Sequence, residues 1–171
     1  SNVYGLKVVG NDNEIKDYID CYFVCAVGSS KLRNKIITNL KNMYPDIKFA
    51  RLIDPSVMMS EFVEIGEGTI ICAGNIITTN INIGEYVIIN LDCTIGHDAI
   101  IKDFCTIYPS VNISGFAEIN RITEIGTGSQ VIQGLKIGEK SIIGAGSVVV
   151  KEIPNNCTAV GDPAKPIKFN Q

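Results

Sequence analysis

The hydrophobic side chains of this chain recur every six residues through most of its length, and not with the periods of two or 3.6 that mark ordinary strands and helices. A fixed six-residue period predicts a stacked parallel β-helix. Three such hexads form one triangular turn of 18 residues, in which the first residue of each hexad points inward and stacks on residues 18 positions away. Seventeen consecutive hexads open with a large aliphatic residue: Ile53, Met59, Ile65, Ile71, Ile77, Ile83, Ile89, Ile95, Ile101, Ile107, Ile113, Ile119, Ile125, Val131, Ile137, Ile143 and Val149.

An antiparallel β-sandwich is the alternative, because its half-buried strands also give even-numbered periods. A sandwich needs hairpin turns at irregular spacing, however, and the hexad register runs unbroken from Ile53 to Val149. The predicted fold class is therefore mainly β: a left-handed parallel β-helix, an exception to the right-handed crossover rule, with a small partial α/β segment in front of it.

Three segments follow from where the register begins and ends. Residues 53–153 form the β-helix, and residues 1–52 look like part of an α/β sugar-binding unit with too few strands to close its own sheet. Residues 154–171 form a tail folded back on the last turns, and its prolines argue against further regular strand there. The elements predicted before the β-helix are a strand over 3–9, a short helix over 13–19, a strand over 22–27, a helix over 31–43 with Leu32, Ile36, Ile37 and Leu40 on one face, and a strand over 47–53.

The charge and cysteine content exclude several classes of function. The net charge is −3 and no basic block is present, so we expect neither nucleic acid nor membrane as a partner. No apolar run has the length of a membrane span. The six cysteines include no CxxC pair, and the chain has one histidine, so we predict no metal site and mostly buried thiols in a reducing cytoplasm.

The one histidine, His97, is the first candidate for chemistry. It takes the third position of its hexad, which points outward, so the register excludes a core role and leaves either an idle surface residue or a working one. Gly115 stands 18 residues on, directly above His97 in the stack, and leaves backbone approachable beside the imidazole. Asp98 follows His97, and its carboxylate is placed to orient the ring and stabilise its protonated form.

A second outward pattern lies at the sixth hexad positions of one face of the β-helix. These residues form a partly aliphatic ladder at steps of 18 residues: Ile70, Ile88, Thr106, Glu124 and Ile142. Stacked apolar residues indicate a covered surface. Either neighbouring copies cover it in a three-fold ring, or the N-terminal segment or the tail of the same chain does.

The hexads, the stretch around His97-Asp98, the stretches 125–128 and 143–149, and the closing segment 160–165 together resemble the hexapeptide-repeat acyltransferases. The resemblance covers about 120 residues and is strongest to the bacterial sugar acetyltransferases, which include sialic acid O-acetyltransferases and UDP-4-amino-sugar N-acetyltransferases. It implies a homotrimer with acetyl-CoA in the cleft between adjacent β-helices.

The resemblance also implies roles for individual residues. His97 would be the general base and Asp98 the acidic residue that supports it. Gly115, Thr127 and Ala145 would lie along the cofactor, as would Thr106, which takes the place of a second histidine found in many relatives. Asn90 would lie near the acceptor, and Gly28 falls in a loop that lines the sugar-nucleotide pocket of relatives, which begin with a strand, a Gly-rich turn and a helix that this sequence lacks.

These features predict an acetyl-CoA-dependent transferase that acetylates an amino or hydroxyl group of a nucleotide-linked sugar in surface-glycan biosynthesis. The acceptor attacks the thioester directly, because no cysteine lies beside His97 in the register. Two alternatives remain open: acetylation of serine or another small alcohol, and a non-catalytic β-helix that acts as a scaffold subunit. His97-Asp98 beside Gly115 favours an enzyme, because a scaffold needs no outward base with open space above it.

Overall fold

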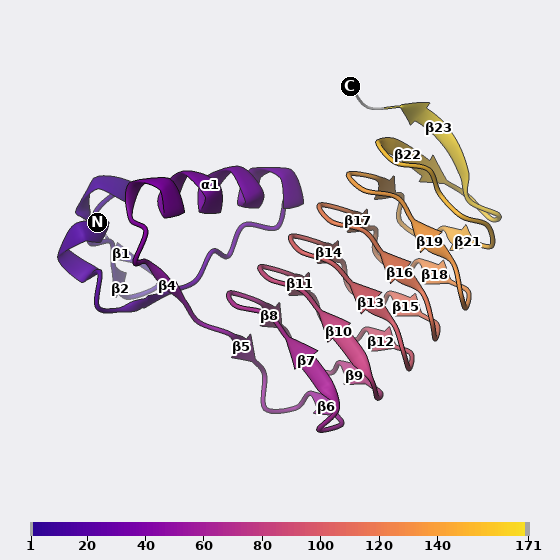
Figure 1. Ribbon diagram of the computed structural model, residues 1–171, viewed down its shortest axis with the longest axis horizontal. Helices are drawn as coiled ribbons and strands as arrows, with labels where there is room; N and C mark the ends of the chain where they lie inside the picture. Colours follow the sequence, from indigo (N-terminus) through magenta and orange to yellow (C-terminus); the bar gives the residue numbers. More distant parts are fainter. Residues whose placement is uncertain (1, 170–171) are drawn as a thin grey trace.

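A computed structural model describes residues 2–169 of the chain. A small α/β segment lies beside one side of a parallel β-helix, and the C-terminal tail closes the far end (Figure 1). The strands from β5 to β21 pair in parallel with partners 18 residues away, for example Ile89 with Ile107. This pairing confirms the parallel β-helix and excludes the sandwich.

Three sheets form the sides of the β-helix, and each turn visits them in the order long, second and third face. The long face contains β5 (Leu52–Ile53), β8 (Ile70–Ile71), β11 (Ile88–Ile89), β14 (Thr106–Ile107), β17 (Glu124–Ile125), β20 (Ile142–Ile143), β22 (Cys157–Val160) and β23 (Lys165–Phe169). The second face contains β6 (Met58–Met59), β9 (Ile76–Ile77), β12 (Thr94–Ile95), β15 (Asn112–Ile113), β18 (Gln130–Val131) and β21 (Val148–Val149). The third face contains β7 (Val63–Ile65), β10 (Ile81–Ile83), β13 (Ile100–Ile101), β16 (Glu118–Ile119) and β19 (Lys136–Ile137).

The hexad openers form the core of the β-helix, as the sequence predicts. From Ile71 to Val149 every opener is at most 2% exposed. The three openers of the first turn are less covered, and Met59 is 43% exposed, because no complete turn lies beneath them.

The fourth residue of most hexads turns the corner in the left-handed backbone conformation. Glycine, Asn and Asp tolerate this conformation, whereas large or β-branched residues adopt it at a cost of about 1–2 kcal/mol. Four large hydrophobic residues nevertheless do so, with φ between 55° and 60°: Tyr86, Phe104, Phe116 and Ile122. The packing of the N-terminal segment accounts for three of them, and the fourth lies beside His97.

The N-terminal segment begins with two short antiparallel strands, β1 (Asn2–Val3) and β2 (Leu6–Lys7). The predicted strand over 3–9 is therefore wrong, because Tyr4 and Gly5 have positive φ and turn the chain back. A 3₁₀ helix, η1 (Asp12–Tyr18), occupies the place of the predicted short helix. The predicted strand over 22–27 is reduced to β3 (Tyr22–Phe23), which pairs in parallel with β4 (Lys48–Phe49). The strand predicted over 47–53 is divided between β4 and β5, which belong to different sheets.

The helix α1 (Ser30–Met43) agrees closely with the helix predicted over 31–43. The side chain of Ser29 caps its N-terminus by accepting a hydrogen bond from the Leu32 amide. The predicted buried face is wrong at one position, because Leu32 is 49% exposed whereas Arg33 is 1% exposed. The buried position is polar because α1 packs there on main-chain carbonyls of the β-helix.

The N-terminal segment packs on the corners that lead into the long face (Figure 1). Tyr86, Phe104 and Ile122 stand 18 residues apart at these corners and join a second hydrophobic core with the buried face of α1. This contact shows what covers two residues of the outward ladder on the long face. Ser30 of the same chain, and not a neighbouring copy, contacts Thr106 and Glu124.

The tail adds two strands to the long face, so the prediction that its prolines prevent regular strand is wrong. β22 pairs in parallel with β20, and β23 pairs in antiparallel fashion with β22. Pro166 is tolerated because β23 is the edge strand of its sheet, where a missing N–H breaks no ladder on the outer side. No helix within residues 2–169 is both long and apolar enough to cross a membrane.

Candidate active site

His97 lies two residues after β12, at the corner between the second and third faces. Its imidazole is 55% exposed, as the hexad register predicts. Nδ1 lies 2.8 Å from Oδ2 of Asp98, so the prediction that the two side chains meet is confirmed. With Nδ1–H donating to the carboxylate, the neutral ring presents the lone pair of Nε2 on its opposite edge.

Gly115 lies against that opposite edge of the ring. A Cβ at position 115 would approach Cε1 and Nε2 of His97 to 2.8 Å, closer than real Cβ contacts occur. Below it, a Cβ on Gly96 would approach the Gly115 amide nitrogen to 2.4 Å. Both glycines are therefore required by close approach between successive turns, and together they let the imidazole lie along bare backbone.

Asn80 completes the support of the histidine, a role that the sequence analysis missed. It stands 18 residues before Asp98 in the same column and donates its side-chain N–H to Oδ1 of that carboxylate. Hydrogen bonds from His97 first, and then from Asn80, lower the pKa of Asp98 from its ordinary value. The carboxylate is thus fixed on both oxygens and ionised at neutral pH.

Phe116 provides an aromatic wall beside the imidazole, and the sequence analysis missed it as well. Its ring meets that of His97 edge to face, with 5.0 Å between the ring centroids. The side chain is 61% exposed, yet its backbone adopts the left-handed conformation that Phe disfavours. A large aromatic residue at a corner position where Gly, Asn or Asp is usual is the signal that the sequence offered.

The remaining predicted site residues lie elsewhere on the β-helix. Thr127 and Ala145 are exposed and stacked at the corner between the long and second faces, each two residues beyond a strand of the long face. Asn90 lies near the same corner, and its side chain donates to the carbonyl of Ile107 over 3.2 Å. Within one chain, His97, Asp98 and Gly115 therefore lie together at one corner of the β-helix. The residues at the corner between the long and second faces lie at the opposite edge of the second face: Asn90, Thr127 and Ala145.

Comparison with known proteins places this arrangement in a family. No family model matches the chain. GDP-perosamine N-acetyltransferase of Escherichia coli O157:H7 is 30% identical to it, over 97% of this chain and 77% of the relative. The chain belongs to the hexapeptide-repeat sugar acetyltransferases. The resemblance that the sequence indicated is confirmed, with a relative named for a GDP-linked sugar.

Solved structures of sugar acetyltransferases agree with this assignment. A perosamine N-acetyltransferase from Caulobacter crescentus with one histidine replaced by asparagine, in complex with CoA and GDP-perosamine, superposes with a TM-score of 0.93 at 30% identity. The match covers 98% of this chain and 80% of that one. The acetyltransferase domain of PglB from Neisseria gonorrhoeae FA1090, in complex with acetyl coenzyme A, gives 0.91 at 30% identity, over 97% of this chain and 81% of that one.

Thr106 has a different environment in this sugar acetyltransferase from the one that the resemblance implied. Its side chain is fully buried beneath the N-terminus of α1. The hydroxyl donates to the carbonyl of Gly28 over 2.7 Å and also lies within hydrogen-bonding distance of Ser30 Oγ and Arg33 Nη2. Thr106 therefore fixes the loop before α1, and Gly28 in that loop contributes its carbonyl to the contact.

Arg33 fastens the same loop, and it is the third residue that the sequence analysis missed. Its guanidinium donates to carbonyls on two successive turns of the β-helix, those of Tyr86, Phe104 and Cys105. Nη1 donates to the carbonyls of Val27 and Gly28 in the loop. Burial lowers the pKa of Arg33, but a guanidinium remains protonated in proteins. The loop that precedes α1 is thus held on the long face by a buried cation.

Within residues 2–169 no group of three or more His, Cys, Asp or Glu side chains is placed to hold a metal ion. All six cysteines are free thiols, and Cys93, Cys105 and Cys157 are buried.

Proposed function

We propose that this chain transfers the acetyl group of acetyl-CoA to the amino group of a nucleotide-linked amino sugar, with His97 as general base. The observation that carries the proposal is the corner geometry: an outward imidazole is bonded to Asp98 through Nδ1 and lies with Nε2 against the bare backbone of Gly115. The relatives named for N-acetylation of GDP-perosamine support an amino sugar as acceptor and surface-glycan synthesis as the context.

The reaction is direct transfer from sulfur to nitrogen. The acceptor amine attacks the thioester carbonyl while Nε2 of His97 takes a proton from the amine; the C–N bond forms, the C–S bond breaks, and the CoA thiolate receives that proton from the imidazolium. Asp98 stabilises the protonated ring in between. The Gly115 N–H donates to no acceptor within the described residues and so remains for the oxyanion of the tetrahedral intermediate.

We further propose that the working enzyme is a homotrimer with its sites between neighbouring copies. Within one chain the corner that carries His97 and Gly115 is separated by a side of the triangle from the corner that carries Thr127 and Ala145. A rotational assembly brings the first corner of one copy against the second corner of the next, together with the neighbour's Asn90 and the Gly28 loop. Acetyl-CoA then lies in that cleft, and the free thiols agree with a cytoplasmic reaction.

Release of free thiol from acetyl-CoA tests the reaction. The acceptors are GDP-perosamine, a UDP-4-amino sugar, free sialic acid and serine. We expect release with a nucleotide-linked amino sugar and a fall of about 10²–10⁴-fold for His97→Ala. Glu85→Ala is the matched control, because Glu85 is exposed at the same hexad position of another corner, between the third and long faces, and should leave the rate unchanged. Release that survives in His97→Ala contradicts the role of the base, and acetyl-CoA that does not bind at all favours the scaffold alternative.

Mixed assemblies test the shared site. Ala145→Trp blocks one corner and His97→Ala removes the base from the other, so each variant alone should be inactive. When the two variants are mixed in equal amounts, unfolded and refolded, about one interface in four joins the intact His97 corner of one variant to the intact Ala145 corner of the other. About a quarter of the wild-type rate should therefore return. Absence of recovery contradicts a site built from two copies.

A further inference from the structure

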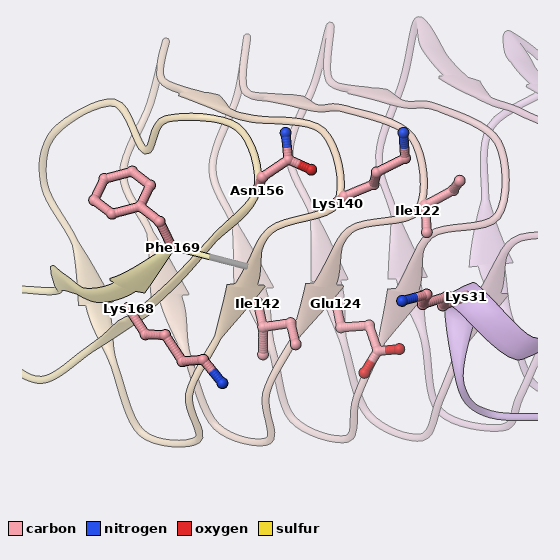
Figure 2. A pocket seen from close by; sticks show the side chains of 8 residues that line it. All are labelled: Lys31, Ile122, Glu124, Lys140, Ile142, Asn156, Lys168 and Phe169. Carbon is pink, nitrogen blue, oxygen red and sulfur yellow. The ribbon is translucent and has the colours of Figure 1, made fainter. Parts of the chain in front are cut away.

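A cavity of about 650 Å³ lies on the outer surface of the long face, away from the His97 corner. It is bounded by the first turn of α1 at one end and by β23 of the tail at the other. Figure 2 shows Glu124 and Ile142 on the strands between them, with Lys31 on one side and Lys168 on the other. Three lysines line the cavity although the chain as a whole carries a net charge of −3.

The lysines at the two ends have no carboxylate partner among residues 2–169. Within the described part of the chain, neither Lys31 nor Lys168 forms an ion pair, whereas Lys140 pairs with Glu139 over 3.1 Å. Figure 2 shows the side chain of Lys140 directed away from Glu124. Two ammonium groups are therefore available to an anion that enters between α1 and β23.

Glu124 forms no ion pair with these lysines within the described residues. One of its oxygens accepts the Ser30 amide over 2.8 Å, and the other accepts the Tyr108 hydroxyl over 3.4 Å. The carboxylate is thus directed to the start of α1, where the helix dipole favours a negative charge. Three lysines and one carboxylate line the cavity, so a ligand there still meets a net positive charge.

Apolar groups complete the lining. Ile142 on β20 and Ile122 at the corner before β17 line the cavity, as does Phe169 on β23, which is 66% exposed. An aromatic side chain beside apolar residues suits the flat ring of a purine base, and ammonium groups suit phosphate oxygens. The combination is typical of a site for a phosphorylated nucleoside and not for a bare inorganic anion.

We infer that this cavity binds the phosphate groups and base of a purine nucleotide, through Lys31 and Lys168. The inference rests on the proposed function, which supplies two such ligands, CoA with its 3′-phosphate and diphosphate and the GDP group of the acceptor. The strands β17 and β20, whose outward residues Glu124 and Ile142 face the cavity, continue directly to the Thr127 and Ala145 corner. A nucleotide in the cavity therefore lies one strand away from that corner.

Isothermal titration of the full chain with CoA, dephospho-CoA and GDP tests this site. Lys31→Gln and Lys168→Gln should each weaken one of these ligands about 5- to 30-fold, the effect of one phosphate contact in a partly exposed site. Lys35→Gln is the matched control, because Lys35 is an exposed lysine on the same helix as Lys31 and does not line the cavity; it should change no affinity.

The three ligands distinguish the sources of the phosphate. Weaker binding of CoA with little change for dephospho-CoA assigns the lysines to the 3′-phosphate, an equal loss for both assigns them to the CoA diphosphate, and a loss for GDP alone assigns them to the sugar nucleotide. Unchanged affinity of both variants for all three ligands overturns the inference while leaving acetyl transfer intact. Failure of the wild-type chain to bind CoA overturns the proposed function itself.

Discussion

Arg33 offers the sharpest test of how the N-terminal segment is held on the β-helix. The substitution Arg33→Met keeps the length and apolar stem of the side chain and removes the guanidinium. Six hydrogen bonds are lost, five of them to main-chain carbonyls. The carbonyls of Cys105 and Gly28 keep another donor, the Ile88 amide and the Thr106 hydroxyl respectively.

Three carbonyls determine the size of the effect. Those of Val27, Tyr86 and Phe104 have Arg33 as their one hydrogen-bond donor within the described residues. An unsatisfied buried carbonyl costs about 1–3 kcal/mol, and removal of a buried charge offsets part of the sum. We expect Arg33→Met to lower the free energy of unfolding by about 3–5 kcal/mol, which corresponds to a fall in Tm of roughly 6–20 °C for a chain of this size.

Urea and thermal denaturation followed by circular dichroism measure this loss, at equal protein concentrations because subunit assembly contributes to stability. Arg51→Met is the control, since Arg51 is exposed and donates a single hydrogen bond, to the carbonyl of Ile65; it should cost less than about 0.5 kcal/mol. Arg33→Lys should recover less than half of the loss, because one nitrogen cannot reach the carbonyls that three nitrogens contact. Equal stability of Arg33→Met and Arg51→Met would refute the reasoning.

Further expectations concern the site and the core. Phe116→Gly relieves a disfavoured backbone conformation on the surface, so the free energy of unfolding should rise by about 1 kcal/mol while turnover falls. Phe104→Gly relieves the same conformation but empties a buried position, so the free energy of unfolding should fall by about 3 kcal/mol. Thermal melts and turnover assays check these opposite signs. Gly115→Ala brings a methyl group to 2.8 Å from the ring of His97, and turnover at saturating acetyl-CoA should fall at least about tenfold with the fold retained. Hydrogen bonds from the imidazole and from Asn80 lower the pKa of Asp98, so its charge stabilises the fold above pH 3.8, and this contribution is lost as the pH falls through the lowered value. The acid limb of a curve of stability against pH should therefore be shallower for Asp98→Asn, and an unchanged limb contradicts this. With a thiol reagent, the exposed Cys21 should react in the folded chain, whereas three buried thiols should react only after unfolding: Cys93, Cys105 and Cys157. Reaction of these three in the folded chain would contradict their packing.

Most of the β-helix could be predicted from the sequence because its pattern is local and repeated. Each inward residue needs only a neighbour 18 positions away, so the same short rule places Ile89 and Ile107 and fixes the outward direction of His97. Its contacts with Asp98 and Gly115 follow from the same register. These two contacts were therefore predictable from the register, whereas the contacts of Asn80 with Asp98 and of Phe116 with His97 were missed.

The attachment of the N-terminal segment could not be predicted in the same way, because it joins residues far apart in sequence without a repeat. Arg33 was missed because helical periodicity assigns a charged residue to the solvent side, whereas main-chain carbonyls of the β-helix receive it here. Thr106 was assigned to the cofactor by position, and the covering helix changes its surroundings. The column of Tyr86, Phe104 and Ile122 did carry a signal, since large residues at left-handed corners need a packing partner to offset their strain.

The 18-residue step that relates the strands from β5 to β21 also determines which changes of length this chain can accept in evolution. Within these turns, deletion of a single strand residue turns the inward side chains that follow it outward, whereas gain or loss of a whole turn preserves the core. Arg33 limits even that freedom, because it spans the turns that contain Tyr86 and Phe104. A turn inserted between these two residues would separate its acceptors, so whole-turn insertions are tolerated near the ends of the stack and excluded where the helix rests on it.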